Sequence, residues 1–177
     1  ASDVYKRQAI GCVYKKVSGV LRVAKQIVTS EYIWDNIRLK GGAYGGGCGF
    51  LNGNYFYMYS YRDPNVNKSY EVFKNVGNYL SEIDMDQKHL NRFIIGAVNV
   101  EDAPLKNNRI NSIVLRRHYN GVTQERLDLR REEMLSVSIN DIREVGQELT
   151  TAMENIVMST VSDQTSIEKS ELFKNII

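Results

Sequence analysis

Arg38 and Tyr44 are the residues of this sequence best suited to act on a substrate oxygen. They stand six positions apart in "IRLKGGAYGGGCGF", residues 37–50. A guanidinium offers a fork of donors to a carbonyl or carboxylate, and a tyrosine hydroxyl can donate to an oxygen that becomes negative during a reaction. At this spacing the two would not share a helix face, but a chain that turns between them can bring Tyr44 back beside Arg38. The pair predicts an oxyanion and substrate clamp.

Spacing alone also fits simpler roles for each residue. Arg38 could be a cation near a helix C-terminus, and Tyr44 a packed loop aromatic. The clamp also lacks a reactive centre of its own. Both interpretations stay open at this point.

The glycines of this segment predict a turn and not a phosphate site. A P-loop needs G-x-x-x-x-G-K-[ST], and a dinucleotide fingerprint needs a strand before the glycines and a helix after them. Here a predicted helix precedes them and strands follow, so the glycines face the wrong pole of the helix dipole for an anion. We expect Gly41, Gly42 and Gly45 to shape a substrate-binding loop.

Other catalytic chemistry is missing from the sequence. His89 and His118 are the only histidines and neither lies in H-E-x-x-H or H-x-x-E-H, so no metal site is predicted and both should be exposed or packing residues. Cys12 and Cys48 form no C-x-x-C, and no G-x-S-x-G elbow occurs. We expect reduced thiols, with Cys48 a small buried residue. This chain alone contains no complete catalytic set.

Composition places the 177 residues among ordinary globular proteins, with 42% hydrophobic and 25% charged residues. The 23 basic and 21 acidic residues are well mixed, so neither a nucleic-acid nor a membrane footprint is predicted. No signal-peptide pattern and no apolar run of about 18 residues occurs. We expect a soluble protein of a reducing compartment, which is the cytoplasm or, in a eukaryote, a mitochondrial or plastid interior. The sequence does not say which of these compartments is the source.

The elements that position Arg38 and Tyr44 can be predicted from local pattern. Residues 1–8 match no clear element and could be a non-native leader, whereas residues 9–177 are expected to form a single domain. Residues 9–16 are a candidate strand. From Ser18 a helical period runs to a stop at Gly41-Gly42, and Asn52-Gly53 between aromatic runs predicts a hairpin.

The second hairpin strand has alternating faces, of which one is almost pure tyrosine. Packing on a half-buried sheet is the favoured explanation, and a wet, adaptable wall for peptide is the alternative. The tyrosines are Tyr55, Tyr57, Tyr59 and Tyr61, alternating with Phe56, Met58, Ser60 and Arg62.

Beyond Pro64 the chain is predicted to be mostly helical, with helices over 67–82, 86–100, 104–119, 123–136 and 138–155. The predicted N-caps are Asp86, Asp102 with Pro104, Thr123, and Ser138 with Asp141, and Gly121 is a predicted C-terminal stop. "NIVMSTVS" is a candidate final strand and "SIEKSELFKNII" a short helix. An antiparallel sheet with helices packed on one face, in the α+β class, is the expected fold.

The longer motifs carry a family resemblance. "YIWDNIRLKGGAYGGG", followed by "YSYRDPN", "IIGAVNVEDAPL", "YNGVTQERLDLRREEML" and "INDIRE", resembles the C-terminal end of the presequence protease branch of the pitrilysin-like zinc metallopeptidases, in the insulinase superfamily. The resemblance runs from about Ser18 to the C-terminus. It implies four homologous α+β domains that close as two halves around a peptide, with this chain as most of the last domain and its first strands missing or reduced.

That resemblance also implies roles for residues and partners. Zinc and the catalytic glutamate would lie in a first domain, in an H-x-x-E-H motif that this chain lacks. Arg38 and Tyr44 match, by motif position, the arginine and tyrosine that reach from the C-terminal half to the substrate. The implied function is the substrate-clamping part of a zinc metalloendopeptidase that degrades unfolded peptides, with the N-terminal half as partner; a non-catalytic peptide-binding or scaffold subunit of the same fold is the alternative.

Overall fold

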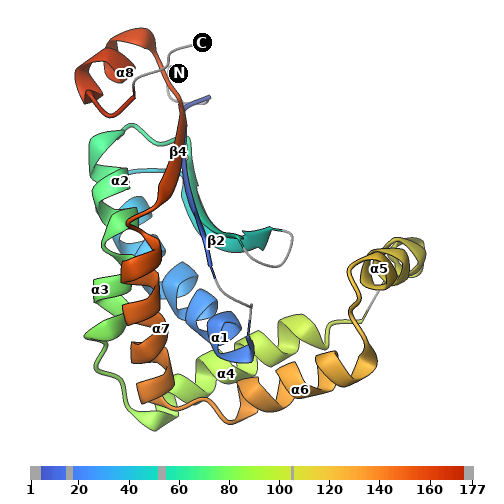
Figure 1. The fold of residues 1–177 in the computed structure, drawn as a ribbon. Coiled ribbons are helices and arrows are strands. Elements are labelled where there is room, and N and C mark those ends of the chain that lie inside the picture. Colours follow the sequence, from blue (N-terminus) through green and yellow to red (C-terminus); the bar gives the residue numbers. More distant parts are fainter. Residues whose placement is uncertain (1–4, 15–17, 52–54, 105, 174–177) are drawn as a thin grey trace.

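The computed structural model describes residues 5–14, 18–51, 55–104 and 106–173, and four strands within them form one antiparallel sheet. These are β1 (Arg7–Val13), β2 (Gly45–Leu51), β3 (Tyr55–Tyr61) and β4 (Ile156–Val161). Their order is β2-β3-β1-β4 (Figure 1). The expected α+β class, the antiparallel sheet and the strand near residue 156 are confirmed.

Strand β1 begins earlier than expected. It starts at Arg7, and the fully buried Gln8 donates from Nε2 to the carbonyl oxygens of Asp63 (3.3 Å) and Asn65 (3.0 Å). The expectation that residues 1–8 match no element is therefore wrong for Arg7 and Gln8. That the leader is non-native stays a prediction.

Two helical segments fill the region before the glycines. Helix α1 (Gly19–Ile27) is capped by Ser18, whose side chain accepts from the amide of Leu21. The chain then continues as the π-helix η1 (Val28–Leu39), where the sequence period had predicted ordinary helix. The π-helix is rare and occurs mostly as single-turn bulges within α-helices, which are frequent at functional sites. The predicted stop before Gly41-Gly42 is confirmed.

The wider winding of η1 fits its burial pattern. The amide of Lys40 donates to the carbonyl of Asp35, five residues back, at 2.9 Å. Val28, Ile33 and Ile37 are buried at spacings of five and four. A π-helix brings such positions onto one face, which here lies against the sheet.

The hairpin strands pair as the sequence predicted. Strand β2 runs antiparallel to β3, from Gly45 opposite Tyr61 to Leu51 opposite Tyr55. Phe56, Met58 and Ser60 are buried beneath the sheet, while the tyrosines lie on its outer face. The predicted Asn52-Gly53 turn lies outside the described residues.

After residue 64 the chain is mostly helical, as expected. The predicted helix over 67–82 is divided at Asn75, and the tail helix starts and ends earlier than its predicted range. The helices are α2 (Asn67–Lys74), α3 (Val76–Ser81), α4 (Gln87–Glu101), α5 (Asn107–Tyr119), α6 (Gln124–Leu135), α7 (Ile139–Ala152) and α8 (Gln164–Ser170).

Most predicted caps are confirmed. Asp86 and Thr123 accept from backbone amides, and Ser138 forms a full capping box with Asp141. Gly121 follows α5 with a φ of 59°.

The predicted cap of the 104–119 helix is wrong. Asp102 is the C-cap of α4, and α5 begins only at Asn107 after Lys106. The Asp102 carboxylate instead pairs with Arg131 on α6.

The helices lie on one face of the sheet, as predicted. Figure 1 shows α2, α3 and α7 along one side, and no described helix lies against the other side. One hydrophobic core joins sheet and helices, with fully buried Met58, Phe73, Leu80 and Leu149 among its members. The tyrosine side of the sheet is therefore left open within the described chain.

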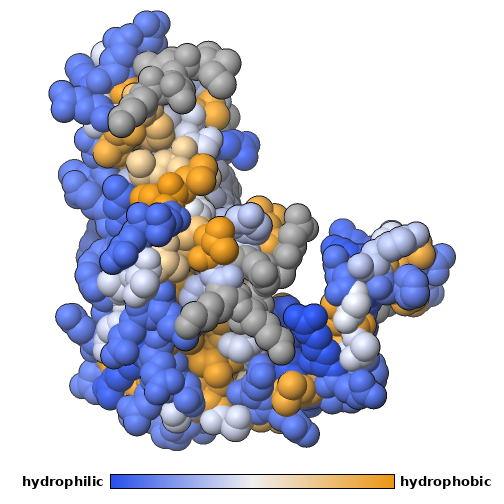
Figure 2. All heavy atoms as spheres, viewed as in Figure 1, coloured by the Kyte–Doolittle hydropathy of each residue, from blue (hydrophilic) through white to orange (hydrophobic). Residues whose placement is uncertain are grey.

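Helix α5 stands apart from this core. It has no buried residue, and Figures 1 and 2 show it as an arm beyond the ends of α4 and α6. Among the described residues, no helix is both long and apolar enough to cross a membrane.

Candidate functional site

Arg38 lies in the last turn of η1, with its side chain exposed. Its guanidinium carbon is 4.1 Å from the centre of the Trp34 ring, one turn earlier. This is cation–π geometry, which orients the guanidinium without occupying its donors with a carboxylate. The donors of Arg38 remain available to a ligand.

A tight loop leads from Arg38 to Tyr44. The amide of Gly42 donates to the Arg38 carbonyl at 3.0 Å, and that of Ala43 to the Ile37 carbonyl at 3.1 Å. Gly42 has a φ of 76°, in the left-handed region that favours glycine. A Cβ on Gly41 would lie 2.5 Å from the Ile37 carbonyl oxygen. Gly41 and Gly42 thus shape the loop sterically.

Tyr44 follows the loop and leads into β2. Its amide donates to the carbonyl of Arg62 at 3.2 Å, and its ring centre is 5.7 Å from that of Tyr61. The Arg62 guanidinium carbon lies 4.8 Å from the Tyr44 ring centre. With 58% of the residue exposed, the Tyr44 hydroxyl can meet a ligand.

The structure does not join Arg38 and Tyr44 directly. No hydrogen bond or ring contact links these two described residues; Arg38 packs on Trp34, whereas Tyr44 packs on Tyr61 and Arg62. They leave opposite ends of one loop and both are exposed. Their action as one clamp therefore stays a prediction.

Trp34 and Arg62 were missed as contributors to this region. Arg62 has a φ of 48°, unusual for a residue other than glycine. Such strain persists only where surrounding contacts hold it, often near functional sites. The motif "YSYRDPN" could have indicated the role of Arg62. The hairpin register places Arg62 next to Tyr44, just beyond the Gly45–Tyr61 pair.

Gly45 has a further role beneath the Tyr61 ring. A Cβ there would lie 2.6 Å from the hydroxyl oxygen of Tyr61, its partner across the strands. The Tyr59 and Tyr61 rings are stacked with centres 6.4 Å apart. The rings thus pack on cross-strand glycines and on one another along β3, and this arrangement does not decide between packing and a peptide-binding wall.

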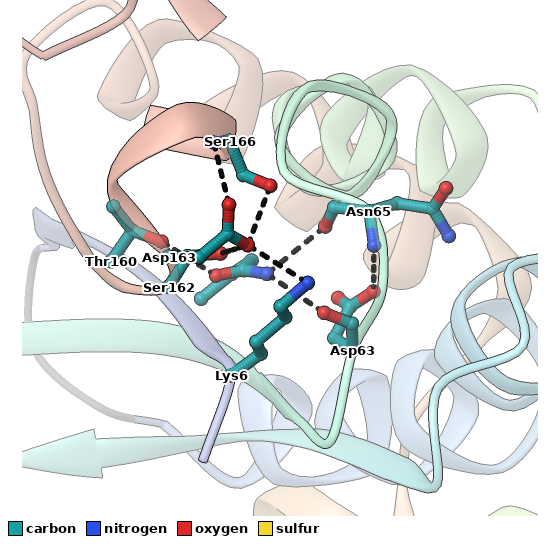
Figure 3. Close-up of polar contacts among 8 residues, drawn as sticks. Lys6, Asp63, Asn65, Thr160, Ser162, Asp163 and Ser166 are labelled. Carbon is teal, nitrogen blue, oxygen red and sulfur yellow. Dashed lines mark hydrogen bonds and ion pairs between the residues drawn. The ribbon is translucent and has the colours of Figure 1, made fainter. Parts of the chain in front are cut away.

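A buried polar network anchors the loop that follows β3 (Figure 3). The Asp63 carboxylate is fully buried and accepts from the hydroxyls of Ser60 (2.5 Å) and Ser69 (2.6 Å) and from the amide of Asn65 (2.9 Å). The Asn65 side chain donates in turn to the carbonyl of Gly41. The network therefore positions the loop between Arg38 and Tyr44.

The same network extends to the C-terminal strand. Lys6 pairs with Asp163 at 3.0 Å, and Thr160 donates to the side-chain oxygen of Gln8 at 2.7 Å. Hydrogen bonds from Ser166, followed by the contact with Lys6, hold the pKa of the Asp163 carboxyl well below its usual range. The start of β1, the loop after β3 and the corner after β4 are tied together in this way (Figure 3).

Neither histidine and neither cysteine is a hydrogen-bond or ring partner of Arg38 or Tyr44 within the described residues. His89 is half-exposed, 2.9 Å from a Glu31 carboxylate oxygen and in a tilted ring contact with Phe93, and His118 lies against Tyr119. Cys12 and Cys48 are buried free thiols, as expected, and burial raises the pKa of each to about 11.

The described residues do not fit a zinc ion. No group of three or more histidine, cysteine, aspartate or glutamate side chains among them could hold a metal. A zinc site that served Arg38 and Tyr44 would need ligands from elsewhere.

Comparisons with known proteins agree with the motifs. The family model described as "PreP C-terminal domain" matches residues 8–163. Presequence protease 1, chloroplastic/mitochondrial, of Arabidopsis thaliana is 32% identical over 166 residues, which is 90% of this chain and 15% of that protein. Protein HypA of Clostridium perfringens is 30% identical over 162 residues, 91% of this chain and 17% of that protein.

The fold comparison points the same way. The crystal structure of pitrilysin superposes with a TM-score of 0.55 at 14% identity, covering 90% of this chain and 19% of that one. This chain spans about a sixth of the length of the first two relatives. Since the family model matches most of its residues, the chain belongs to the PreP C-terminal domain family.

Proposed function

We propose that this chain is the last domain of a larger zinc metalloendopeptidase and that it holds unfolded peptide substrates inside a closed chamber. The observation that carries the proposal is the loop from Arg38 to Tyr44, which presents both side chains exposed in a chain of the PreP C-terminal domain family. A buried network anchors that loop through Asn65 and Gly41. Such anchoring favours a fixed geometry toward a substrate.

In this proposal, Tyr44 and Arg38 bind the substrate, and Arg62 orients Tyr44. Tyr44 would donate a hydrogen bond from its hydroxyl to the carbonyl oxygen under attack, where negative charge develops. Arg38 would hold the substrate through a neighbouring carbonyl or carboxylate. Arg62, beside the Tyr44 ring, would orient that tyrosine.

Zinc and its ligands are assigned to the N-terminal half of the same protein. Support comes from the length of the relatives, of which this chain covers 15–17%, and from the absence of an H-x-x-E-H motif in this sequence. The proposed partners are that half and a peptide substrate, with no nucleic acid and no membrane. Two buried thiols suit a reducing compartment, the cytoplasm or an organelle interior.

Site variants of the complete protein test the proposal. Arg38→Ala and Tyr44→Phe should each lower kcat/KM for an unfolded peptide about 100-fold, the usual loss when one oxyanion donor is removed. Tyr119→Phe, on the exposed arm α5, is the matched control and should leave turnover unchanged. Circular dichroism should show the same fold for all three.

Unchanged turnover in both site variants would favour the alternative, a non-catalytic scaffold subunit. Absence of an H-x-x-E-H motif from the complete protein would have the same consequence.

A further inference from the structure

Three tyrosines of β3 lie flat across the neighbouring edge strand β2. The hydroxyl oxygens of Tyr57, Tyr59 and Tyr61 occupy the positions where side chains of Gly49, Gly47 and Gly45 would begin, 2.7, 3.1 and 2.6 Å from an ideal Cβ. Each glycine is the direct cross-strand partner of its tyrosine. Because these alternate residues of β2 are glycines, the three tyrosine rings can lie flat on the strand, and their hydroxyls form a row over β2. We call Tyr57, Tyr59 and Tyr61 the tyrosine row.

The row repeats at nearly the period of an extended peptide. Ring centres are 6.1 Å apart between Tyr57 and Tyr59 and 6.4 Å apart between Tyr59 and Tyr61. An extended chain advances about 6.6 to 6.8 Å every two residues. Successive hydroxyls can therefore meet alternate carbonyl groups of one peptide strand without a change of register over three contacts.

The hydroxyls of the row have no partner among the described residues. Buried tyrosines elsewhere in the chain do: Tyr32 donates to the carbonyl of Val72 at 2.7 Å, and Tyr70 to that of Ser159 at 2.6 Å. Packing on glycine needs only the ring, so phenylalanine would satisfy it equally. The hydroxyls are the feature that packing does not explain.

The Tyr59 hydroxyl is protonated at neutral pH and can therefore donate a hydrogen bond. Burial, followed by the neighbouring Tyr57 and Tyr61, raises the pKa of Tyr59 above its ordinary value. The Tyr59 hydroxyl therefore keeps its proton at neutral pH and offers it to an acceptor.

The rest of the outer face leaves room for a chain beside the row. Ala9 and Gly11 on β1 stand opposite Tyr59 and Tyr57 and carry nothing larger than a methyl group. Val13 and Val157 are 64% and 77% exposed on the same face. Beside Tyr57 and Tyr59 the face therefore carries small or apolar side chains, with Ser159 opposite Ala9, whereas the exposed cation Arg7 stands opposite Tyr61.

The row is also continuous with the candidate site. The ring of Tyr44 lies 5.7 Å from that of Tyr61, so four aromatic rings follow one another from the loop along β3. A peptide held at Tyr44 can continue in an extended form over the row.

We propose that the tyrosine row binds the backbone of an extended peptide, with the hydroxyls of Tyr57, Tyr59 and Tyr61 donating hydrogen bonds to carbonyls of alternate residues. This rests on the proposed function in taking peptide as the substrate. Because backbone groups are common to all sequences, recognition depends on extended form and not on side-chain identity.

Fluorescence anisotropy with a labelled, unstructured 20-residue peptide tests this on the 177-residue chain, without need of turnover. The triple variant Tyr57→Phe, Tyr59→Phe, Tyr61→Phe keeps the rings and removes the hydroxyls. Each lost hydroxyl should weaken binding about fivefold, so that the triple variant, where the losses add in free energy, should bind about 100-fold more weakly. A scrambled peptide should bind the unchanged chain equally well. The matched control, Tyr119→Phe on the arm α5, removes an exposed hydroxyl away from the sheet and should have no effect.

Equal binding by the triple variant and the unchanged chain would overturn the proposal, as would failure of the unchanged chain to bind the peptide at millimolar concentration. The single variants provide the same measurement if the triple variant fails to fold. These outcomes are separate from those of the proposed function. Loss of turnover in Tyr44→Phe alongside equal binding by the triple variant would leave the protease assignment standing and reject the row.

Discussion

Asn65 is the residue through which the buried network reaches the candidate site. Its amide donates to Asp63 and its side chain to the carbonyl of Gly41. Asp63 is buried without an ion pair of its own among the described residues, and three hydrogen bonds compensate its charge. Removal of that carboxylate would leave two hydroxyls and one amide without an acceptor.

We therefore expect Asp63→Ala to lower the free energy of unfolding by about 3 kcal/mol. Asp84→Ala, which removes an exposed carboxylate, is the matched control and should change it by less than about 0.5 kcal/mol. Urea denaturation followed by circular dichroism measures both. Equal stability of the two variants would show that the network does not hold the loop.

The buried thiols give a second prediction at the residue scale. With pKa values raised to about 11, Cys12 and Cys48 hold few thiolates at pH 8, and the thiolate is the form that reacts. Iodoacetamide at pH 8 should label both far more slowly in the native chain than in urea, as mass spectrometry would measure. Fast native labelling would contradict the burial.

The same shifts predict a pH dependence of stability. A folded pKa above the unfolded value means that the folded state holds its proton more tightly, so the stabilisation is complete below about pH 9 and is lost as pH rises toward 11. Cys12→Ala with Cys48→Ala should flatten the decline of the unfolding free energy in that window.

At the scale of elements, glycines set how closely α3 and α7 approach. A Cβ on Gly77 would lie 2.6 Å from the amide of Thr150 and 2.8 Å from the carbonyl oxygen of Gly146. The nearest obstructing atom is the Thr150 hydroxyl oxygen at 2.3 Å, and the two that follow are backbone atoms, which cannot rotate away. The two helices are thus in contact at their main chains, which supports the core beneath the sheet.

Gly77→Ala should therefore lower the free energy of unfolding by about 2 kcal/mol through overpacking. Gly96→Ala, in α4, is the matched control because its Cβ would meet only the Gln26 side chain at 3.4 Å. It should be neutral or stabilising by about 0.5 kcal/mol, since alanine favours helix. Thermal unfolding of both variants checks this, and similar melting temperatures would reject the close contact.

At the scale of the whole molecule, the outer sheet face and α5 are both uncovered within the described chain. The relatives are about six times longer than this chain. We propose that the N-terminal half and a bound peptide cover these two surfaces in the complete protein.

Helix α5 should exchange its amide hydrogens much faster than α7. Opening of α5 exposes no buried side chain, whereas opening of α7 exposes Ile142 and Leu149. Hydrogen exchange with mass spectrometry on the 177-residue chain measures the difference. Equal protection of the two helices would mean that α5 has a partner in solution.

We expect the purified 177-residue chain neither to bind zinc tightly nor to cleave peptide. Its two histidines are far apart in sequence, and neither belongs to a zinc motif. Metal analysis and a fluorogenic peptide assay test this. Stoichiometric zinc together with peptidase activity would overturn the division of labour between the halves.

Sequence pattern by itself determined the local features of this protein. The caps at Asp86, Thr123 and Ser138, the stop before Gly41 and the alternation along β3 depend on residues a few positions apart, so local chemistry decides them. The family motifs can also be recognised from the amino-acid sequence alone.

Only the tertiary structure decided how these parts meet. The burial of Gln8 against Asp63, 55 residues away, depends on β1 lying between β3 and β4. The π-helical winding of η1, the contact of Arg62 with Tyr44 and the tyrosine rings over Gly45 arise from packing and strand register across the whole core. No local spacing encodes them, because the free energy that selects them is summed over contacts between distant segments.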